Sequence, residues 1–244
     1  AAPLRWHHQP GRIALVGHQG TGFAFDNEGP RHRVLLEPFA LADRLVTNGE
    51  WDAFIADGGY ADARLWLADG WAWVQREKIA APLYWKDNEH FTHQGWAVRD
   101  THAPVAHISH FEADAFATWT GARLPTEFEW EAVARGQDGA SAAPAHDPAA
   151  GNQLDSAAAP LPTGSPGLFG DCWQFTRSAY LPYPGFRVAG GAVGEYNGKF
   201  MSGQVVLRGA SCATVRGHSR ASYRNFFYPH QRWQFTGLRL AKDA

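Results

Sequence analysis

Residues 119–131 of the chain read WTGARLPTEFEWE and contain the end of one predicted helix and the start of the next. Gly121 is placed to end one helix, because glycine readily adopts the left-handed conformation that closes a helix. Thr126 and Glu129 then match a capping box, in which each side chain accepts a hydrogen bond from the backbone N–H of the other. The pattern predicts a tight corner between two helices, the second near residues 127–135.

The charged residues of this stretch are predicted to be framework. Arg123 is placed to pair with a carboxylate such as Glu127 or Glu131, and arginine–carboxylate pairs are among the strongest polar contacts in proteins. A role in chemistry is the alternative for Arg123 and Glu127. Because a helix corner needs such pairs to hold its two arms together, we favour the framework interpretation.

The same helix signals occur twice more along the chain. Thr47 with Glu50, and Ser109 with Glu112, again have the capping-box spacing. They predict helices near residues 48–57 and 110–120.

Strands are predicted to be short, at residues 33–39, 204–208 and 237–241. With 26 Gly and 15 Pro, much of the remaining chain is expected to be loop. A small sheet with few helices and long loops indicates an α+β fold rather than a doubly wound sheet. Residues 137–166 are rich in Ala, Pro, Gly and Ser and are expected to form a surface excursion within a single domain, 1–244.

Composition narrows the class of protein. The chain has 244 residues, 45% of them hydrophobic, and a net charge of -2, which is typical of a globular protein and gives no basis for nucleic-acid or anionic-membrane binding. No apolar run approaches the roughly 20 residues of a transmembrane helix.

The chain begins Ala1-Ala2-Pro3 and its only methionine is Met201. Either a signal peptide was removed or the chain is a piece of a longer protein, and with only two cysteines we expect a cytoplasmic piece.

Four ordered motifs resemble the formylglycine-generating-enzyme family, whose fold is related to that of C-type lectins. They are residues 104–109 with 119–131, residues 170–176, residues 208–211 and residues 237–241. The second motif departs from the usual pattern, because Asp171, Cys172 and Gln174 stand where the family usually has Asn, Val and Glu. The resemblance implies that Trp130, Trp173 and Arg208 are framework residues.

Further segments look like the C-terminal domain of ergothioneine-biosynthesis sulfoxide synthases. They are residues 23–32, 65–71, 82–85, 195–201, 223–229 and 232–235. The resemblance implies an oxidoreductase that uses iron(II) and O2 to join cysteine or γ-glutamylcysteine to trimethylhistidine (hercynine). In that family the iron is bound by three histidines of a separate N-terminal four-helix, DinB-like domain. That domain is absent from this sequence, so we expect the isolated chain to be inactive.

Asn225, Phe226 and Phe227 are the predicted substrate-binding residues. By resemblance, they lie on a loop, residues 223–229, that rims the cavity facing the iron domain. Aromatic faces attract a trimethylammonium group by cation–π interaction, and Asn225 offers hydrogen bonds to the rest of the substrate. Some family members carry Trp-Asp in place of Phe226-Phe227, with the Asp associated with the γ-glutamyl amino group, so this chain is expected to use free cysteine. The alternative is that all three are core residues.

Tyr196 and a cluster of His and Glu residues are further candidates for chemistry. Tyr196 is a weak candidate for a catalytic phenol and is interpreted as structural. His107, His110 and Glu112 superficially resemble a metal motif, but Glu112 is committed to the helix cap. No metal ligand set is therefore assigned within the chain.

Three alternatives remain from the sequence. A copper-dependent formylglycine-generating oxidase would need a pair of thiolates, whereas Cys212 and Cys172 lie far apart in the sequence. Calcium could be held by Asn152, Asp155 and Asp171, although the replacements at positions 171 and 174 count against such a site. The last alternative is a lectin-like binding module without catalytic activity.

Overall fold

The computed structural model describes residues 3–92, 94–136, 146–154, 159–161 and 167–244, and of Val193 the backbone alone. The helices are α1 (Asn48–Ala56), α2 (Ala68–Glu77), α3 (His110–Trp119) and α4 (Glu127–Ala134). Short 3-10 turns are η1 (Asp26–Glu28), η2 (Ala63–Leu65), η3 (Ala192–Glu195) and η4 (Gly198–Phe200). The strands are β1 (Trp6–Gln9), β2 (Arg12–Val16), β3 (His32–Leu36), β4 (Phe39–Ala42), β5 (Trp85–Lys86), β6 (Glu89–Thr92), β7 (Gly95–Val98), β8 (Trp173–Ala179), β9 (Val205–Gly209), β10 (Asn225–Phe227), β11 (Thr236–Leu238) and β12 (Ala241–Asp243).

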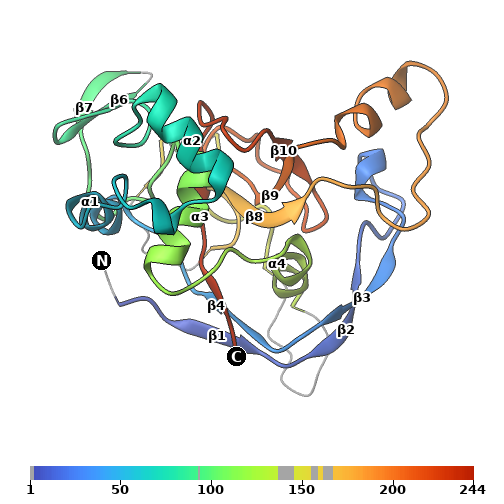
Figure 1. Cartoon of the computed structure of the whole chain (residues 1–244). Coiled ribbons are helices and arrows are strands. Elements are labelled where there is room, and N and C mark those ends of the chain that lie inside the picture. Colours follow the sequence, from blue (N-terminus) through green and yellow to red (C-terminus); the bar gives the residue numbers. More distant parts are fainter. Residues whose placement is uncertain (1–2, 93, 137–145, 155–158, 162–166) are drawn as a thin grey trace.

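A central sheet has the strand order β10-β9-β8-β11, with β11 parallel to β8 and the other pairs antiparallel. Near it, β1, β4 and β12 form a second sheet with β4 in the middle, so the last strand of the chain pairs with an early strand (Figure 1). β2 pairs with β3, and β5, β6 and β7 form a separate ribbon. The α+β class with few helices is confirmed, but the strands form several small sheets where the sequence predicted one.

All three predicted helices are confirmed, and each begins with the predicted capping box. Glu50, Glu112 and Glu129 each accept a hydrogen bond from the backbone of the N-cap residue, three positions earlier. Helix α2 was not predicted, because its N-cap residue Leu67 has no side chain able to cap the helix.

Two of the predicted strands divide in the structure. The predicted strand 33–39 is the end of β3 and the start of β4, because Pro38 has no N–H to continue a ladder. The predicted strand 237–241 is the end of β11 and the start of β12, which belong to different sheets. Between them the fully buried guanidinium of Arg239 donates to Gln174 Oε1 and to the carbonyl oxygen of Ala42. The strand predicted at 204–208 is confirmed as β9.

The ion pair predicted for Arg123 is wrong in its partner. Its Nη1 and Nη2 donate to Glu129 at 2.9 and 2.7 Å, and its Nε donates to Asp243 at 2.8 Å. Glu127 and Glu131 lie on other faces of α4 and bind other arginines. Arg123 therefore fastens the capping box of α4 to the C-terminal strand.

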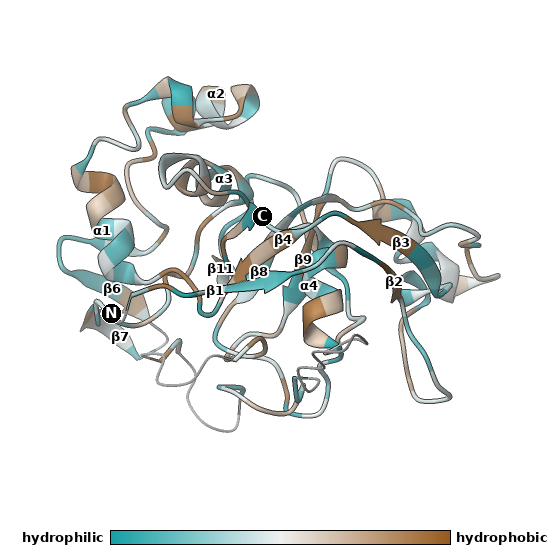
Figure 2. Cartoon of the chain, turned by 90° about the horizontal axis from the view of Figure 1, so that it is seen from below, coloured by the Kyte–Doolittle hydropathy of each residue, from teal (hydrophilic) through white to brown (hydrophobic). Residues whose placement is uncertain are grey.

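Two hydrophobic clusters make up most of the core. In the first, the rings of Trp51 and Phe116 stack at 4.9 Å, joining α1 to α3. In the second, Trp130 of α4 is fully buried near the β2–β3 hairpin. Figure 2 shows this hairpin as a strongly apolar part of the molecule, and its outer face leaves Ile13 and Leu35 more than 60% exposed.

Candidate functional site

A cavity of about 680 Å³ opens beside the edge strand β10. All four residues considered from the sequence for substrate contact or catalysis line this cavity: Tyr196, Asn225, Phe226 and Phe227. The other lining residues are Phe25, Asn27, Asn197, Phe200, Gln204, Tyr223, Arg224, Tyr228, Gln231 and Trp233. The cavity therefore joins a segment near the N-terminus to segments about 200 residues later.

Asn225, Phe226 and Phe227 lie on a strand, which corrects the predicted loop. They form β10 and pair with Leu207, Val206 and Val205 of β9. All three side chains are half-buried, so the residues are not interred in the core. Asn225 Oδ1 accepts the Phe226 N–H at 2.9 Å, which fixes the orientation of the amide. Sheet pairing therefore gives this wall of the cavity a defined geometry.

Aromatic rings supply much of the cavity wall. Phe226 stacks on Tyr180 with ring centroids 4.1 Å apart and lies 6.0 Å from Phe200. Phe227 contacts Trp233 edge-to-face at 5.7 Å. Tyr196 lies on the rim with 64% of its surface exposed. Such a wall suits a flat or a quaternary ammonium ligand.

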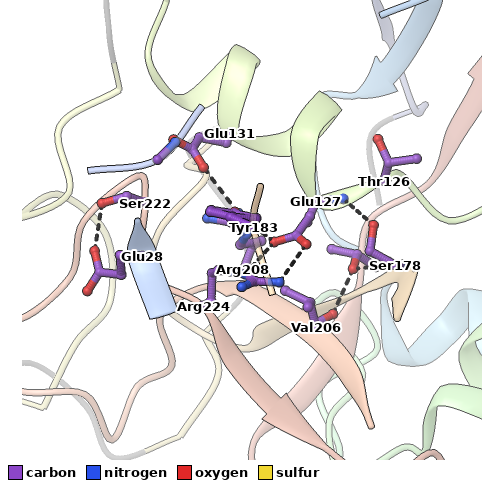
Figure 3. Close-up of polar contacts among 12 residues, drawn as sticks. Glu28, Thr126, Glu127, Glu131, Ser178, Tyr183, Val206, Arg208, Ser222 and Arg224 are labelled. Carbon is purple, nitrogen blue, oxygen red and sulfur yellow. Dashed lines mark hydrogen bonds and ion pairs between the residues drawn. The ribbon is translucent and has the colours of Figure 1, made fainter. Parts of the chain in front are cut away.

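A buried ion-pair network lies beneath this wall (Figure 3). Glu127 of α4 accepts two hydrogen bonds from Arg224 at 2.9 Å and one from Arg208 at 2.8 Å. Tyr183 donates a further bond to Glu127, and Glu131 lies 3.1 Å from Arg208. The side chains of Glu127, Arg208 and Arg224 are each at most 2% exposed.

The network removes the positive charge of Arg224 from the cavity. Burial alone would raise the pKa of Glu127, but attraction to Arg224 and Arg208 outweighs burial and holds that pKa below its ordinary value. Glu127 is therefore ionised at neutral pH and neutralises Arg224. The cavity is left with neutral amides and aromatic rings as its main binding groups.

A second carboxylate anchors the N-terminal part of the wall. Glu28 is fully buried and accepts hydrogen bonds from Arg220, Ser222 and the Phe25 N–H. Burial opposes ionisation, yet these bonds keep the pKa of Glu28 below its ordinary value. The anchored turn places Asn27 so that its Nδ2 donates to the Tyr180 hydroxyl at 2.8 Å. Asn27 Oδ1 has no hydrogen-bond partner among the residues that the structure describes.

Sequence reasoning did not assign several of these residues a role. Phe25, Asn27, Tyr223 and Trp233 all line the cavity. Each lies in a segment that resembles the sulfoxide synthases, and this resemblance is the signal that could have identified it. Their convergence depends on contacts between distant segments.

The remaining framework candidates lie away from the cavity lining. Trp130 donates from Nε1 to Gln174 at 2.8 Å, and Trp173 begins β8 in the main core cluster. Arg208 of β9 also donates to the carbonyl oxygens of Ala221 and Tyr223, which orients the chain before β10.

The described residues do not gather a metal-binding group. Within the described ranges, no three His, Cys, Asp or Glu side chains are placed to hold a metal ion together. Burial lowers the pKa of both His107 and His110 to about 4. Glu112 caps α3 as expected and also pairs with Arg232 at 3.0 Å.

The calcium and copper alternatives fit the residues poorly. Asp171 Oδ1 accepts hydrogen bonds from Asn152 Nδ2 and the Leu161 N–H, which occupy that oxygen, and Asp155 lies outside the described residues. Cys172 and Cys212 are free and buried. Burial raises the pKa of both thiols, that of Cys212 to about 12, so neither is a thiolate at neutral pH.

Comparison with solved structures supports the fold. PvdO from Pseudomonas aeruginosa superposes with a TM-score of 0.63 at 18% identity, covering 98% of this chain and 94% of PvdO. Variable protein 1 of Treponema denticola gives a TM-score of 0.62 at 16% identity, covering 98% and 95% of the two chains.

In the part of the chain that the structure describes, no helix has the length and apolar character needed to cross a bilayer.

Sequence comparison identifies the family. Hercynine oxygenase of Mycobacterium tuberculosis is 36% identical over 90% of this chain, and that of Mycolicibacterium thermoresistibile is 37% identical over 91%. The chain spans 56% and 54% of the lengths of these two relatives. The formylglycine-generating enzyme of Thermomonospora curvata is 35% identical over 52% of this chain and 46% of its own length. The profile of the sulfatase-modifying factor enzyme 1-like domain matches residues 9–244, and the chain belongs to this family.

Proposed function

We propose that the chain is the substrate-binding part of an iron(II)- and O2-dependent sulfoxide synthase that joins cysteine to trimethylhistidine. The similarity to hercynine oxygenases over nine-tenths of the chain supports an oxidoreductase of this type. One observation carries the proposal for this chain. A single cavity brings together Asn225, Phe226, Phe227 and Tyr196, the residues that the resemblance to sulfoxide synthases had singled out.

In this proposal the aromatic wall binds the trimethylammonium group. The rings of Phe226, Phe200 and Tyr196 form a continuous series with centroid separations of 6.0 and 5.5 Å. Cation–π attraction is worth about 2 kcal/mol or more when the cation is desolvated. The amide of Asn225 donates a hydrogen bond to the substrate, since its Oδ1 is already engaged with the Phe226 N–H.

Iron would be held by a companion domain, since the described residues contain no suitable ligand group. Bound iron would supply the activation of O2. The residues of this chain would bind and orient the two organic substrates and exclude water from the cavity.

Free cysteine is the favoured sulfur donor over γ-glutamylcysteine. An extra γ-glutamyl amino group would need a carboxylate to pair with its charge. No described Asp or Glu lines the cavity, and Phe226 and Phe227 stand where some members of the sulfoxide synthase family carry Trp-Asp.

The substitution Asn225→Ala tests the binding role directly. Loss of a hydrogen bond to a charged substrate costs about 1.5–3 kcal/mol, so trimethylhistidine should bind this variant at least tenfold more weakly than the unmodified chain. Isothermal titration calorimetry measures the difference. Asn88→Ala, at an exposed turn outside the cavity, is the matched control and should leave the affinity unchanged. Equal affinities for the two variants would contradict the role of Asn225.

The isolated chain is expected to show no turnover. The assay supplies iron(II), O2, trimethylhistidine and cysteine, and detects the sulfoxide product by mass spectrometry. Product formation by the chain alone would contradict the assignment of the iron ligands to a companion domain. The binding role of Asn225 would remain testable by the titration above.

A further inference from the structure

A second cavity, of about 290 Å³, lies beneath the β5–β6–β7 ribbon. Trp85 and Phe91 come from the ribbon, His107 from the segment before α3, and Phe235 from the segment before β11. Trp233 lines this cavity and also the first one. The other lining residues of the two cavities differ, so the second cavity is a distinct space that shares one wall with the first.

Two strained residues meet in this cavity. Tyr84 and His107 have φ angles of +71° and +61°, in the left-handed region that residues other than glycine rarely occupy. Their rings contact edge-to-face at 4.9 Å, and the Leu83 N–H donates to the carbonyl oxygen of His107 at 3.0 Å. A left-handed residue other than glycine costs about 1–3 kcal/mol, and such residues cluster at ligand sites. Here the strained pair sets two rings against one cavity.

The described lining of the cavity offers no charged side chain that could pair with an ionic ligand. The Arg99 guanidinium lies 3.8 Å from the centroid of the Trp85 ring and pairs with Asp52. None of the described lining residues is an Asp or a Glu. Burial lowers the pKa of His107 to about 4 and also lowers the pKa of His90, so both imidazoles are neutral at pH 7.

The size and lining of the cavity define its ligand. Ligand pockets usually measure about 300–1,000 Å³, so a volume of about 290 Å³ suits a ligand no larger than one or two fused rings. Tyr84, Trp85, Phe91, Trp233 and Phe235 offer ring faces and edges for stacking. The neutral imidazole of His107 offers one donor and one acceptor. Its Nδ1 has no partner with normal hydrogen-bond geometry among the described residues, although the backbone of Trp233 and Gln234 lies close to the ring.

We propose that this second cavity is a binding site for an uncharged, flat heteroaromatic ring of one or two fused rings. The ring stacks between the ribbon and the strained Tyr84–His107 pair, and a polar atom of the ring bonds to the imidazole. This site is separate from the site for trimethylhistidine and does not depend on the proposed synthase activity.

5-Fluoroindole is a suitable probe, because its ¹⁹F resonance reports binding by the full chain. We expect saturable binding, with affinity at least fivefold weaker in Phe91→Ala, which removes a ring that is 46% exposed and therefore is not needed for the core. Phe23→Ala removes a ring that is 66% exposed and outside both cavities, and should leave the affinity unchanged. 5-Fluorotryptamine, which carries an ammonium group, should bind at least fivefold more weakly than 5-fluoroindole.

Three outcomes would overturn the proposal. The first is the absence of saturable 5-fluoroindole binding up to its solubility limit. The second is a loss of affinity in Phe226→Ala but not in Phe91→Ala, which would place the probe in the first cavity. The third is tighter binding of 5-fluorotryptamine, which would contradict the charge argument. Circular dichroism of each variant checks that it is folded. If Phe91→Ala does not fold, His90→Ala provides a second substitution in the cavity.

Discussion

Replacing Glu127 with Gln is expected to lower the free energy of unfolding by about 3–5 kcal/mol, the usual cost of breaking a buried ion pair on one side. The amide has nearly the shape of the carboxylate, so the change removes charge and little volume. Arg224 then loses the carboxylate that accepts from its Nε and Nη2, while Arg208 keeps Glu131 at 3.1 Å. Since Arg224 is 1% exposed, water cannot replace the lost partner.

Urea unfolding followed by tryptophan fluorescence measures this loss. Glu195→Gln is the matched control, because Glu195 also pairs with a cation, Lys199, but both side chains are 64% exposed. Exposed pairs contribute about 0–1 kcal/mol, so the control should differ little from the unmodified chain. A Glu127→Gln variant as stable as the Glu195→Gln control would show that the buried ion-pair network beneath the cavity wall does not stabilise the fold.

Acidification from pH 7 to pH 4.5 is expected to destabilise the fold, and His110 contributes about 2 kcal/mol of this loss. Burial lowers the folded-state pKa of His110 to about 4, from an ordinary value of about 6.5. Between these values the unfolded chain binds the proton and the folded chain does not, so stability falls as the pH falls. The Thr176 backbone offsets part of the shift, but among the described residues neither ring nitrogen has a partner with normal hydrogen-bond geometry.

His110→Phe removes the titrating group while preserving a flat ring beside Phe175. The variant should be at least as stable as the unmodified chain at pH 7, because no buried polar nitrogen is left unpaired. Its loss of stability between pH 7 and pH 4.5 should be smaller by about 2 kcal/mol. His8→Gln, at an exposed position of β1, should leave the pH dependence unchanged. Identical pH profiles for His110→Phe and the unmodified chain would contradict the assignment.

The features that could be predicted from sequence are those fixed over a few residues. The three capping boxes each join positions three residues apart, and all three helices begin where those boxes indicate. Helix α2 begins without a side-chain cap and could not be found in this way. The pairing of Arg123 was predicted wrongly because spacing alone does not say which of three neighbouring glutamates faces it.

The site illustrates the same division between local and distant contacts. The resemblance pointed to Asn225, Phe226 and Phe227, and the structure places all three at one cavity. Asn27 reaches that cavity through a hydrogen bond to Tyr180, 153 residues away. No periodicity or motif spacing encodes such a contact, so it required the folded chain.

The first cavity has a buried ion-pair network beneath its wall and an exposed rim, and this difference bears on how the protein could be re-engineered. Residues of the network, such as Glu127 and Arg224, stabilise the scaffold and are at most 2% exposed. Tyr196 and Trp233 on the rim are 64% and 58% exposed, and exposed positions usually tolerate substitution within about 0.5 kcal/mol. A mutant library confined to the rim would therefore sample new ligand preferences while leaving expression and solubility largely intact.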